Sequence, residues 1–254
     1  AWPVEGADWK ITQVTNNTRA DETPRISGPN VVWRGSGDQI FFYNVWARVE
    51  RVISTGISND LQYICGPKVC WRGSDGDDEI FLYNGAGEAN ISNNPACDDT
   101  DPRIGNGGHV AWQGYCDYTS PNTHSDYEIF LYDGVSVTNI SNDHGSYFQG
   151  EDTAPQVNAL GHAVWVKATF PLGTKEIYFH GASSPINLSN TAEYEELDPQ
   201  MNDNDNVVWS GHDGTDYEIF FWDGQLPVAG HVTKITNNDQ PDARPRINND
   251  GKVV

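Results

Sequence analysis

The chain has 254 residues and a formal net charge of −21, with 36 acidic residues against 15 Lys and Arg. Nucleic acids and anionic membrane surfaces would repel such a chain, so we expect neither as a partner. No stretch approaches the roughly 18 consecutive apolar residues of a membrane-spanning helix, so we expect no membrane insertion.

Four short β-rich runs recur along the chain in a constant order. The first is of the Pro-Arg-Ile type, as at Pro24, and the second ends in a tryptophan. The third is of the Glu-Ile-Phe type, and the fourth, after a turn such as Asp223-Gly224, ends in Ile-Ser-Asn or a variant of it. The landmark tryptophans are Trp33, Trp71, Trp112, Trp165 and Trp209. Short strands bounded by Gly, Asn, Asp and Pro predict an all-β protein, and their regular repetition predicts a repeat architecture.

The repeats divide a single domain, residues 1–254, into five complete units and one divided unit. The complete units cover about 18–55, 56–94, 95–143, 144–191 and 192–238. The divided unit combines 239–254 with 1–17. Four antiparallel strands repeated radially form the blade of a β-propeller. We therefore predict a six-bladed β-propeller of four-stranded antiparallel blades, with one blade shared between the N- and C-termini. Five blades is the alternative count.

The repeat units resemble the TolB-like repeats of bacterial and archaeal envelope or secreted proteins. The resemblance rests on the Asp-x-x-Pro-Arg-Ile, Val-Val-Trp and Asp-Tyr-Glu-Ile-Phe-Leu-Tyr-Asp-Gly segments and extends over essentially the whole chain. The Ser-Pro-Asp-Gly turn of that family is poorly kept here, and residues 248–251 come closest to it. The resemblance implies a propeller used mainly to bind proteins or ligands.

The four cysteines predict two disulfides. Cys65 and Cys70 flank a tight turn, and Cys97 and Cys116 lie at the same end of two neighbouring strands. The Cys-x-x-Cys spacing of zinc sites is absent, and free thiols are the alternative. Disulfides Cys65–Cys70 and Cys97–Cys116 would indicate an oxidising compartment, so we expect a secreted, periplasmic or cell-surface protein.

Two Asp-Gly loops between the second and third runs are candidate calcium sites. One contains Asp75 and Asp77, and the other contains Asp213 and Asp216. Calcium prefers several hard oxygen ligands at close spacing, which both loops offer, although neither matches the EF-hand pattern. The alternative is that these aspartates only make turns by accepting backbone hydrogen bonds. Ca²⁺ is the one cofactor that we expect.

Strand direction places these acidic loops on one face of the disc, together with two long insertions, 113–125 and 142–152. Long loops on a rigid scaffold commonly carry binding sites. The insertions hold aromatic and histidine side chains suited to stacking on a glycan, or else to packing the loops. These candidate ligand-binding residues are Tyr115, Tyr118, His124, Tyr147 and Phe148.

Arginine recurs in the first run, at Arg25, Arg103 and Arg246. These residues either line a central tunnel and contact an anionic ligand, or bridge to nearby acidic loops. The tryptophan of the second run recurs in five units, which indicates core packing.

No catalytic residue is predicted. The chain has no Gly-x-Ser-x-Gly, phosphate-cradling or haem-attachment motif, and its seven histidines share no cluster spacing. We therefore expect a non-catalytic propeller that binds a protein or glycan through its acidic loop face and is stabilised by calcium. The alternatives are a polysaccharide-active lyase or hydrolase with a site at the tunnel mouth, and a structural repeat module of a larger surface protein or assembly.

Overall fold

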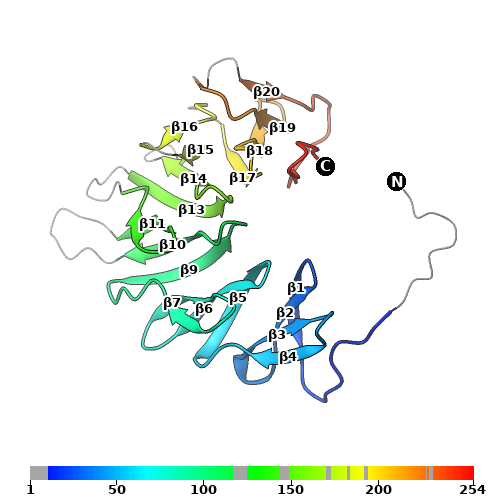
Figure 1. Ribbon diagram of the computed structural model, residues 1–254. Helices are drawn as coiled ribbons and strands as arrows, with labels where there is room; N and C mark the ends of the chain where they lie inside the picture. The colour runs from blue at the N-terminus through cyan, green and yellow to red at the C-terminus, as the bar shows by residue number, and fades with distance from the viewer. Residues whose placement is uncertain are drawn as a thin grey trace, which may run out of the picture.

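The computed structural model describes residues 11–116, 125–142, 149–169, 173–181, 184–191, 194–226, 228 and 231–254. These residues confirm the all-β prediction, since they form five antiparallel sheets of four strands, each in sequential order. The sheets fan around a common centre, with the first strand of each nearest that centre (Figure 1). No helix in the described ranges is long and apolar enough to cross a membrane.

Each sheet is built from one contiguous segment. Sheet 1 comprises β1 (Glu22–Ser27), β2 (Asn30–Arg34), β3 (Ile40–Asn44) and β4 (Val49–Val52), with a short 3₁₀ turn at Ser36–Asp38. Sheet 2 comprises β5 (Ile57–Cys65), β6 (Lys68–Ser74), β7 (Asp78–Tyr83) and β8 (Glu88–Asn90). Sheet 3 comprises β9 (Cys97–Ile104), β10 (Val110–Cys116), β11 (Asp126–Tyr132) and β12 (Val137–Asn139). Sheet 4 comprises β13 (Gln149–Val157), β14 (Ala163–Thr169), β15 (Lys175–His180) and β16 (Ile186–Asn187). Sheet 5 comprises β17 (Glu196–Met201), β18 (Val207–His212), β19 (Tyr217–Trp222) and β20 (Val232–Lys234).

The predicted count of six blades is wrong for the described residues, which form five sheets. The C-terminal segment does begin a further repeat, because the amide of Arg244 donates to Ser210 Oγ and places the segment against sheet 5. It contains only one isolated β-bridge, Ile247–Val253, which is too little pairing to make a sheet. Residues 11–17, which were predicted to supply the outer strands, form no strand, and Ile11 is 97% exposed. Residues 1–10 lie outside the described ranges.

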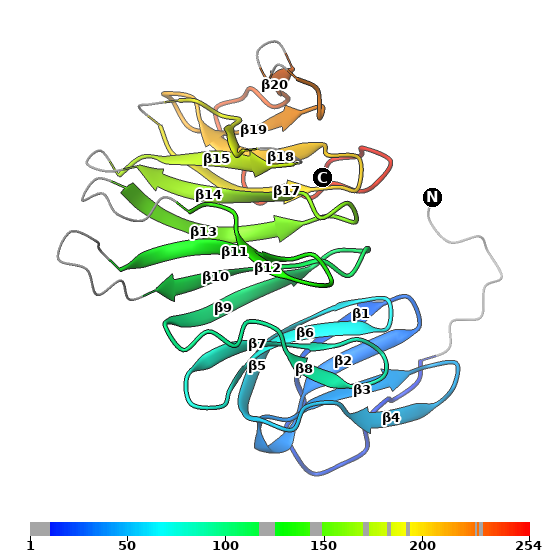
Figure 2. The ribbon, with the colours of Figure 1, turned by 60° about the vertical axis from the view of Figure 1, so that its left-hand side comes forward.

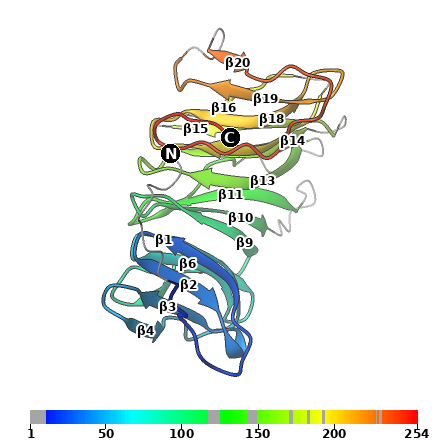
Figure 3. The ribbon, with the colours of Figure 1, turned by 90° about the vertical axis from the view of Figure 1, so that its right-hand side faces the viewer.

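Successive sheets pack face to face in chain order (Figure 2, Figure 3). At the junction of sheets 4 and 5, Val164 and Ile177 pack in one core cluster with Trp209. At the junction of sheets 1 and 2, Val32 and Trp71 likewise pack in one core cluster. The five landmark tryptophans are between 0% and 3% exposed, which confirms that they pack the core. Because both faces of an inner sheet are covered, its strands read as nearly continuous apolar runs.

A buried polar contact ties the outer strand of each sheet to the third strand. In sheet 2, the hydroxyl of Ser92 accepts the amide of Ile80 at 2.9 Å and donates to the carboxylate of Glu79. The same arrangement joins Ser141 to Glu128, Ser189 to Glu176, and Thr236 to Glu218. The contact explains why Glu-Ile-Phe and Ile-Ser-Asn recur together, since each motif satisfies polar groups that the other buries.

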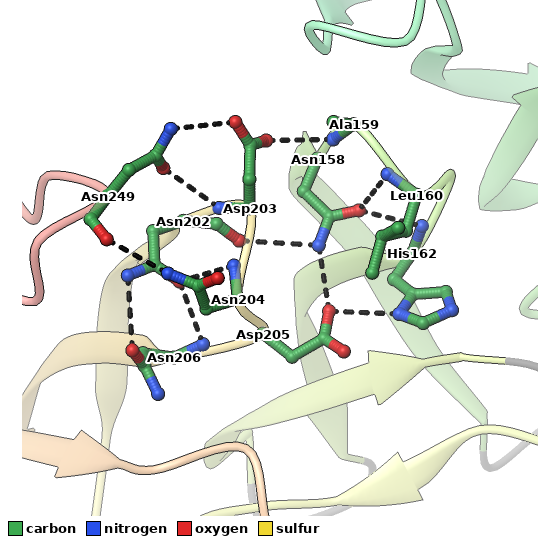
Figure 4. Close-up of polar contacts among 10 residues, drawn as sticks. All are labelled: Asn158, Ala159, Leu160, His162, Asn202, Asp203, Asn204, Asp205, Asn206 and Asn249. Carbon is green, nitrogen blue, oxygen red and sulfur yellow. Dashed lines mark hydrogen bonds and ion pairs between the residues drawn. The ribbon is translucent and has the colours of Figure 1, made fainter.

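The turns between first and second strands are joined across sheets (Figure 4). The side-chain amide of Asn158 donates to the backbone carbonyl of Asn202. The side-chain amide of Asn202 in turn donates to the backbone carbonyl of Asn248. Asp203 accepts from the amide of Ala159 and from the side chain of Asn249. This ladder holds sheet 4, sheet 5 and the C-terminal segment in register.

One of the two predicted disulfides is confirmed and the other is wrong. Cys97 and Cys116 are direct cross-strand partners, with Cα atoms 4.0 Å apart, and form a disulfide. Cys65 and Cys70 are free thiols. Cys65 lies opposite Lys68 whereas Cys70 lies opposite Tyr63, so the two cysteines are diagonal neighbours. Diagonal Cα atoms are about 7–8 Å apart, which is beyond the range of about 4.4–6.8 Å that a disulfide spans.

The thiol content of the unfolded protein tests this assignment. We expect two titratable thiols per chain in denaturant without reductant, because Cys65 and Cys70 are unpaired. Reduction should lower the free energy of unfolding by about 3 kcal/mol, because it opens a medium-length loop. The absence of free thiols before reduction would contradict the assignment.

Candidate functional site

The loop between β6 and β7 brings three carboxylates together. Asp75, Asp77 and Glu79 each place an oxygen within 4.8 Å of the others. Asp75 accepts a hydrogen bond from Asn90 Nδ2 at 3.1 Å, and Glu79, which is buried, accepts from the amide of Asn94 at 3.0 Å. Among the described residues, no Lys, Arg or His forms an ion pair with this triad. The group therefore concentrates negative charge that no cationic side chain of the described residues pairs with.

The equivalent loop of sheet 5 is different, because it contains its own cation. Asp213, Asp216 and Glu218 form a second triad with the same 4.8 Å limit. Lys234 Nζ lies 2.8 Å from Asp213 Oδ2, and this hydrogen bond lowers the pKa of Asp213 to about 2. Asp213 also accepts the amide of Thr215 at 2.9 Å, as expected of a turn-forming aspartate.

One substitution accounts for this difference between the triads. Lys234 pairs with Phe220 in sheet 5, and Asn90 pairs with the equivalent Phe81 in sheet 2. An amide thus stands where the other sheet has an ammonium group. Lys234 therefore offsets part of the negative charge of the triad in sheet 5. No described cation does so for Asp75, Asp77 and Glu79 in sheet 2, and we call this group the open triad.

A buried carboxyl lies beside the open triad. Asp99 is 1% exposed, and among the described residues no hydrogen bond of normal geometry reaches its carboxylate oxygens, although Ser92 and Trp112 lie near enough to favour its charged form. Burial raises its pKa to about 8, and the charges of Glu79 and Asp77 contribute to this rise. A buried carboxyl in this position takes up either a proton or a cation. Sequence reasoning did not find it.

The junctions of sheets 3 and 4 and of sheets 4 and 5 hold buried acids that do have partners. Asp152 and Glu196 occupy the position of Asp99, and each accepts an indole N–H at 2.6 Å, from Trp165 and Trp209 respectively. Burial raises the pKa of Asp152 well above its usual value and raises that of Glu196 to about 7. Sequence reasoning did not predict that these first-strand junction carboxyls are buried, because their burial depends on the packing of neighbouring sheets.

The structure brings two predicted residues of different kinds to one pocket. Tyr115 and Asp77 both line a pocket of about 430 Å³, whose wall also includes Cys97 of the disulfide. Tyr115 is 40% exposed, and its ring centroid lies 5.1 Å from that of Tyr127. The remaining predicted ligand-binding residues, Tyr118, His124, Tyr147 and Phe148, lie outside the described residues.

The two roles considered for the recurring arginines stay predictions. Arg103 forms an ion pair at 2.5 Å with Asp101, two residues away in the same strand β9. Arg25 and Arg246 make side-chain hydrogen bonds only to backbone carbonyls among the described residues, those of Gln62 and Pro245.

Comparison with solved structures identifies the architecture. The β-propeller domain of the Trilobed protease from Pyrococcus furiosus has a TM-score of 0.58 and 10% identity, with 86% of this chain and 68% of that chain covered. The fold is that of a β-propeller. A Mycobacterium tuberculosis puromycin-hydrolyzing peptidase has a TM-score of 0.55 and 14% identity, with 89% of this chain and 40% of that chain covered.

An oligogalacturonate lyase in complex with manganese has a TM-score of 0.61 and 10% identity, with 88% of this chain and 66% of that chain covered. No protein-family model matches the sequence, and no curated protein matches it. At these identities the similarity establishes the propeller fold only, and the resemblance to TolB-like repeats stays a prediction.

The pH dependence of stability tests the junction carboxyls. The folded pKa of Glu196 is about 7, above the usual value of about 4.5, so its stabilising contribution is complete below pH 4.5 and is lost as the pH rises through 7. The free energy of unfolding should therefore fall by roughly 3 kcal/mol between pH 4.5 and pH 8 on account of this group.

Denaturant unfolding of the Glu196→Gln variant at several pH values measures this contribution. The amide can still accept the indole hydrogen bond but does not titrate, so the variant should lose that part of the pH dependence. Glu50→Gln, on the exposed strand β4, is the matched control. Parallel pH profiles for wild type and Glu196→Gln would show that Glu196 does not titrate in this range.

Proposed function

We propose that this chain is a non-catalytic binding propeller that takes up one divalent cation, Ca²⁺, at the junction of sheets 2 and 3. The observation that carries the proposal is the open triad of Asp75, Asp77 and Glu79, with the buried carboxyl of Asp99 beside it. Carboxylate oxygens are the ligands that Ca²⁺ prefers, and the cation would offset charge that the fold otherwise leaves uncompensated.

The cation would support a binding surface on the same face. Asp77 belongs both to the triad and to the wall of the pocket that Tyr115 lines, so an ion held there would fix one side of that pocket. We propose that this face binds a protein or a glycan, with Tyr115 as a stacking residue. The disulfide beside the pocket fits a secreted, periplasmic or cell-surface location.

Thermal melts of chelator-treated protein test the cation site. Added Ca²⁺ should raise the Tm by about 5–11 °C once its concentration exceeds the Kd a hundredfold, because it binds only the folded state. The Asp75→Asn, Asp77→Asn double variant should lose this rise. Asp213→Asn, at the same loop position in sheet 5, should keep it. An unchanged wild-type Tm, or loss of the rise in Asp213→Asn, would refute the assignment.

The Lys234→Asn variant provides a second, independent readout. It gives sheet 5 the residue that sheet 2 has at this position, so the calorimetric stoichiometry should increase from one Ca²⁺ to two. An unchanged stoichiometry would show that the lysine is not what separates the two triads.

A polysaccharide-active lyase is the second candidate. It is favoured by the likeness of the fold to an oligogalacturonate lyase in complex with manganese, and Mn²⁺ also prefers oxygen ligands. Mn²⁺-dependent release of unsaturated oligogalacturonates, abolished in the Asp75→Asn, Asp77→Asn variant, would favour the lyase over the non-catalytic binder.

A further inference from the structure

The innermost strands carry hydrogen-bond donors at one equivalent position of every repeat. Each of these residues pairs with the second or third residue of the Val-Val-Trp type strand, as Arg25 does with Val32 and Gln200 does with Val208. The Arg246 amide and carbonyl likewise bond to Val254 in the C-terminal segment. The six residues are Arg25, Tyr63, Arg103, Gln156, Gln200 and Arg246.

The residues at this position are basic or neutral, whereas the chain as a whole is strongly acidic. Three of the six residues are arginines and none is acidic, although acidic residues outnumber basic ones by 36 to 15 overall. Every one of the six side chains has at least one N–H or O–H to donate. The first strands of neighbouring sheets contact one another around the centre, so these donors lie on facing inner strands (Figure 1).

Two of the arginines are held in place by one aromatic ring. The guanidinium carbon of Arg25 lies 4.0 Å from the ring centroid of Tyr63, and that of Arg103 lies 4.1 Å from the same centroid. Two cations repel each other, so we place them on opposite faces of the ring. Stacking fixes the plane of each guanidinium and directs its N–H groups outward along its edges.

The donors of the two arginines are only partly used. Arg25 donates from Nε to the carbonyl of Gln62, and its two terminal amino groups have no hydrogen-bond partner among the described residues. Arg103 donates from Nη1 to Asp101, which neutralises part of its charge. Arg25 and Tyr63 line a pocket of about 420 Å³ between the first strands of sheets 1 and 2. A solvent-accessible pocket therefore has a rigid cationic wall.

We propose that Arg25 and Arg103 together form an anion site that binds a small molecule with two separated carboxylates, one at Arg25 in this pocket and one at Arg103 on the other side of the Tyr63 ring. A planar carboxylate matches the edge of a guanidinium through two parallel hydrogen bonds. The ring of Tyr63 stands between the two arginines, so a single compact anion such as phosphate cannot contact both. This site is independent of the cation site, which lies in the loops between second and third strands.

Calorimetric titration with glutarate tests the proposal, with acetate and phosphate as comparison anions in calcium-free, low-salt buffer. Glutarate should bind saturably and at least tenfold more tightly than either comparison anion, because only it can contact both arginines. Arg25→Gln and Arg103→Gln should each weaken glutarate binding about tenfold, through the loss of a charge-assisted pair. Gln156 and Gln200 show that the fold accepts glutamine at this position.

Arg51→Gln is the matched control, because it removes the same charge from the exposed strand β4. Its glutarate affinity should stay within twofold of wild type. Tyr63→Leu should weaken binding although both arginines remain, because the stacking that orients them is lost. The proposal is overturned if wild type shows no saturable glutarate binding, if phosphate binds equally well, or if Arg51→Gln weakens binding as much as Arg25→Gln.

Discussion

The structure depends on the packing of the tryptophan face of one sheet against the valine and isoleucine face of the sheet before it. Val164 and Ile177 meet Trp209 in this way, and the other junctions repeat the pattern. A four-stranded sheet with two apolar faces cannot be stable alone, because exposing either face to water is unfavourable. Each sheet therefore depends on its neighbours, and a radial arrangement is one of the few that covers both faces of every inner sheet.

Packing the sheets together also buries polar side chains at their junctions. In sheets 2 to 5 the start of the third strand is buried, and the chain places a glutamate there that accepts a hydrogen bond from a serine or threonine after the outer strand. A second carboxyl enters from the first strand of the following sheet. Burial raises the pKa of the first-strand carboxyls Asp99, Asp152 and Glu196, and the neighbouring glutamates add to this rise. The fold thereby couples its stability to pH through residues that have no need to contact a ligand.

The junction of sheets 2 and 3 departs from this pattern, and its carboxylates are the ones that we propose bind a ligand. No hydrogen bond of normal geometry joins Asp99 to the indole of Trp112, whereas Asp152 and Glu196 each accept one, and the adjacent triad lacks the lysine found in sheet 5. Repetition makes both differences visible, since each sheet serves as the reference for the others. The central arginines are a separate electrostatic region, positive within a strongly acidic chain.

The sequence alone determined the all-β class, the four-strand repeat, the buried tryptophans and the Cys97–Cys116 pair, because strand periodicity and turn residues are local properties. Tertiary structure decided the remainder. Whether Cys65 can reach Cys70 depends on register, and whether residues 245–254 complete a sheet depends on strands that must come from elsewhere in the chain. The aspartates of the two loops look alike in sequence, yet Lys234 reaches only one of them from a strand about twenty residues away. Distant residues meet only when the sheets stack, so neither the buried carboxyls nor the Arg25–Tyr63–Arg103 contact could be read from spacing.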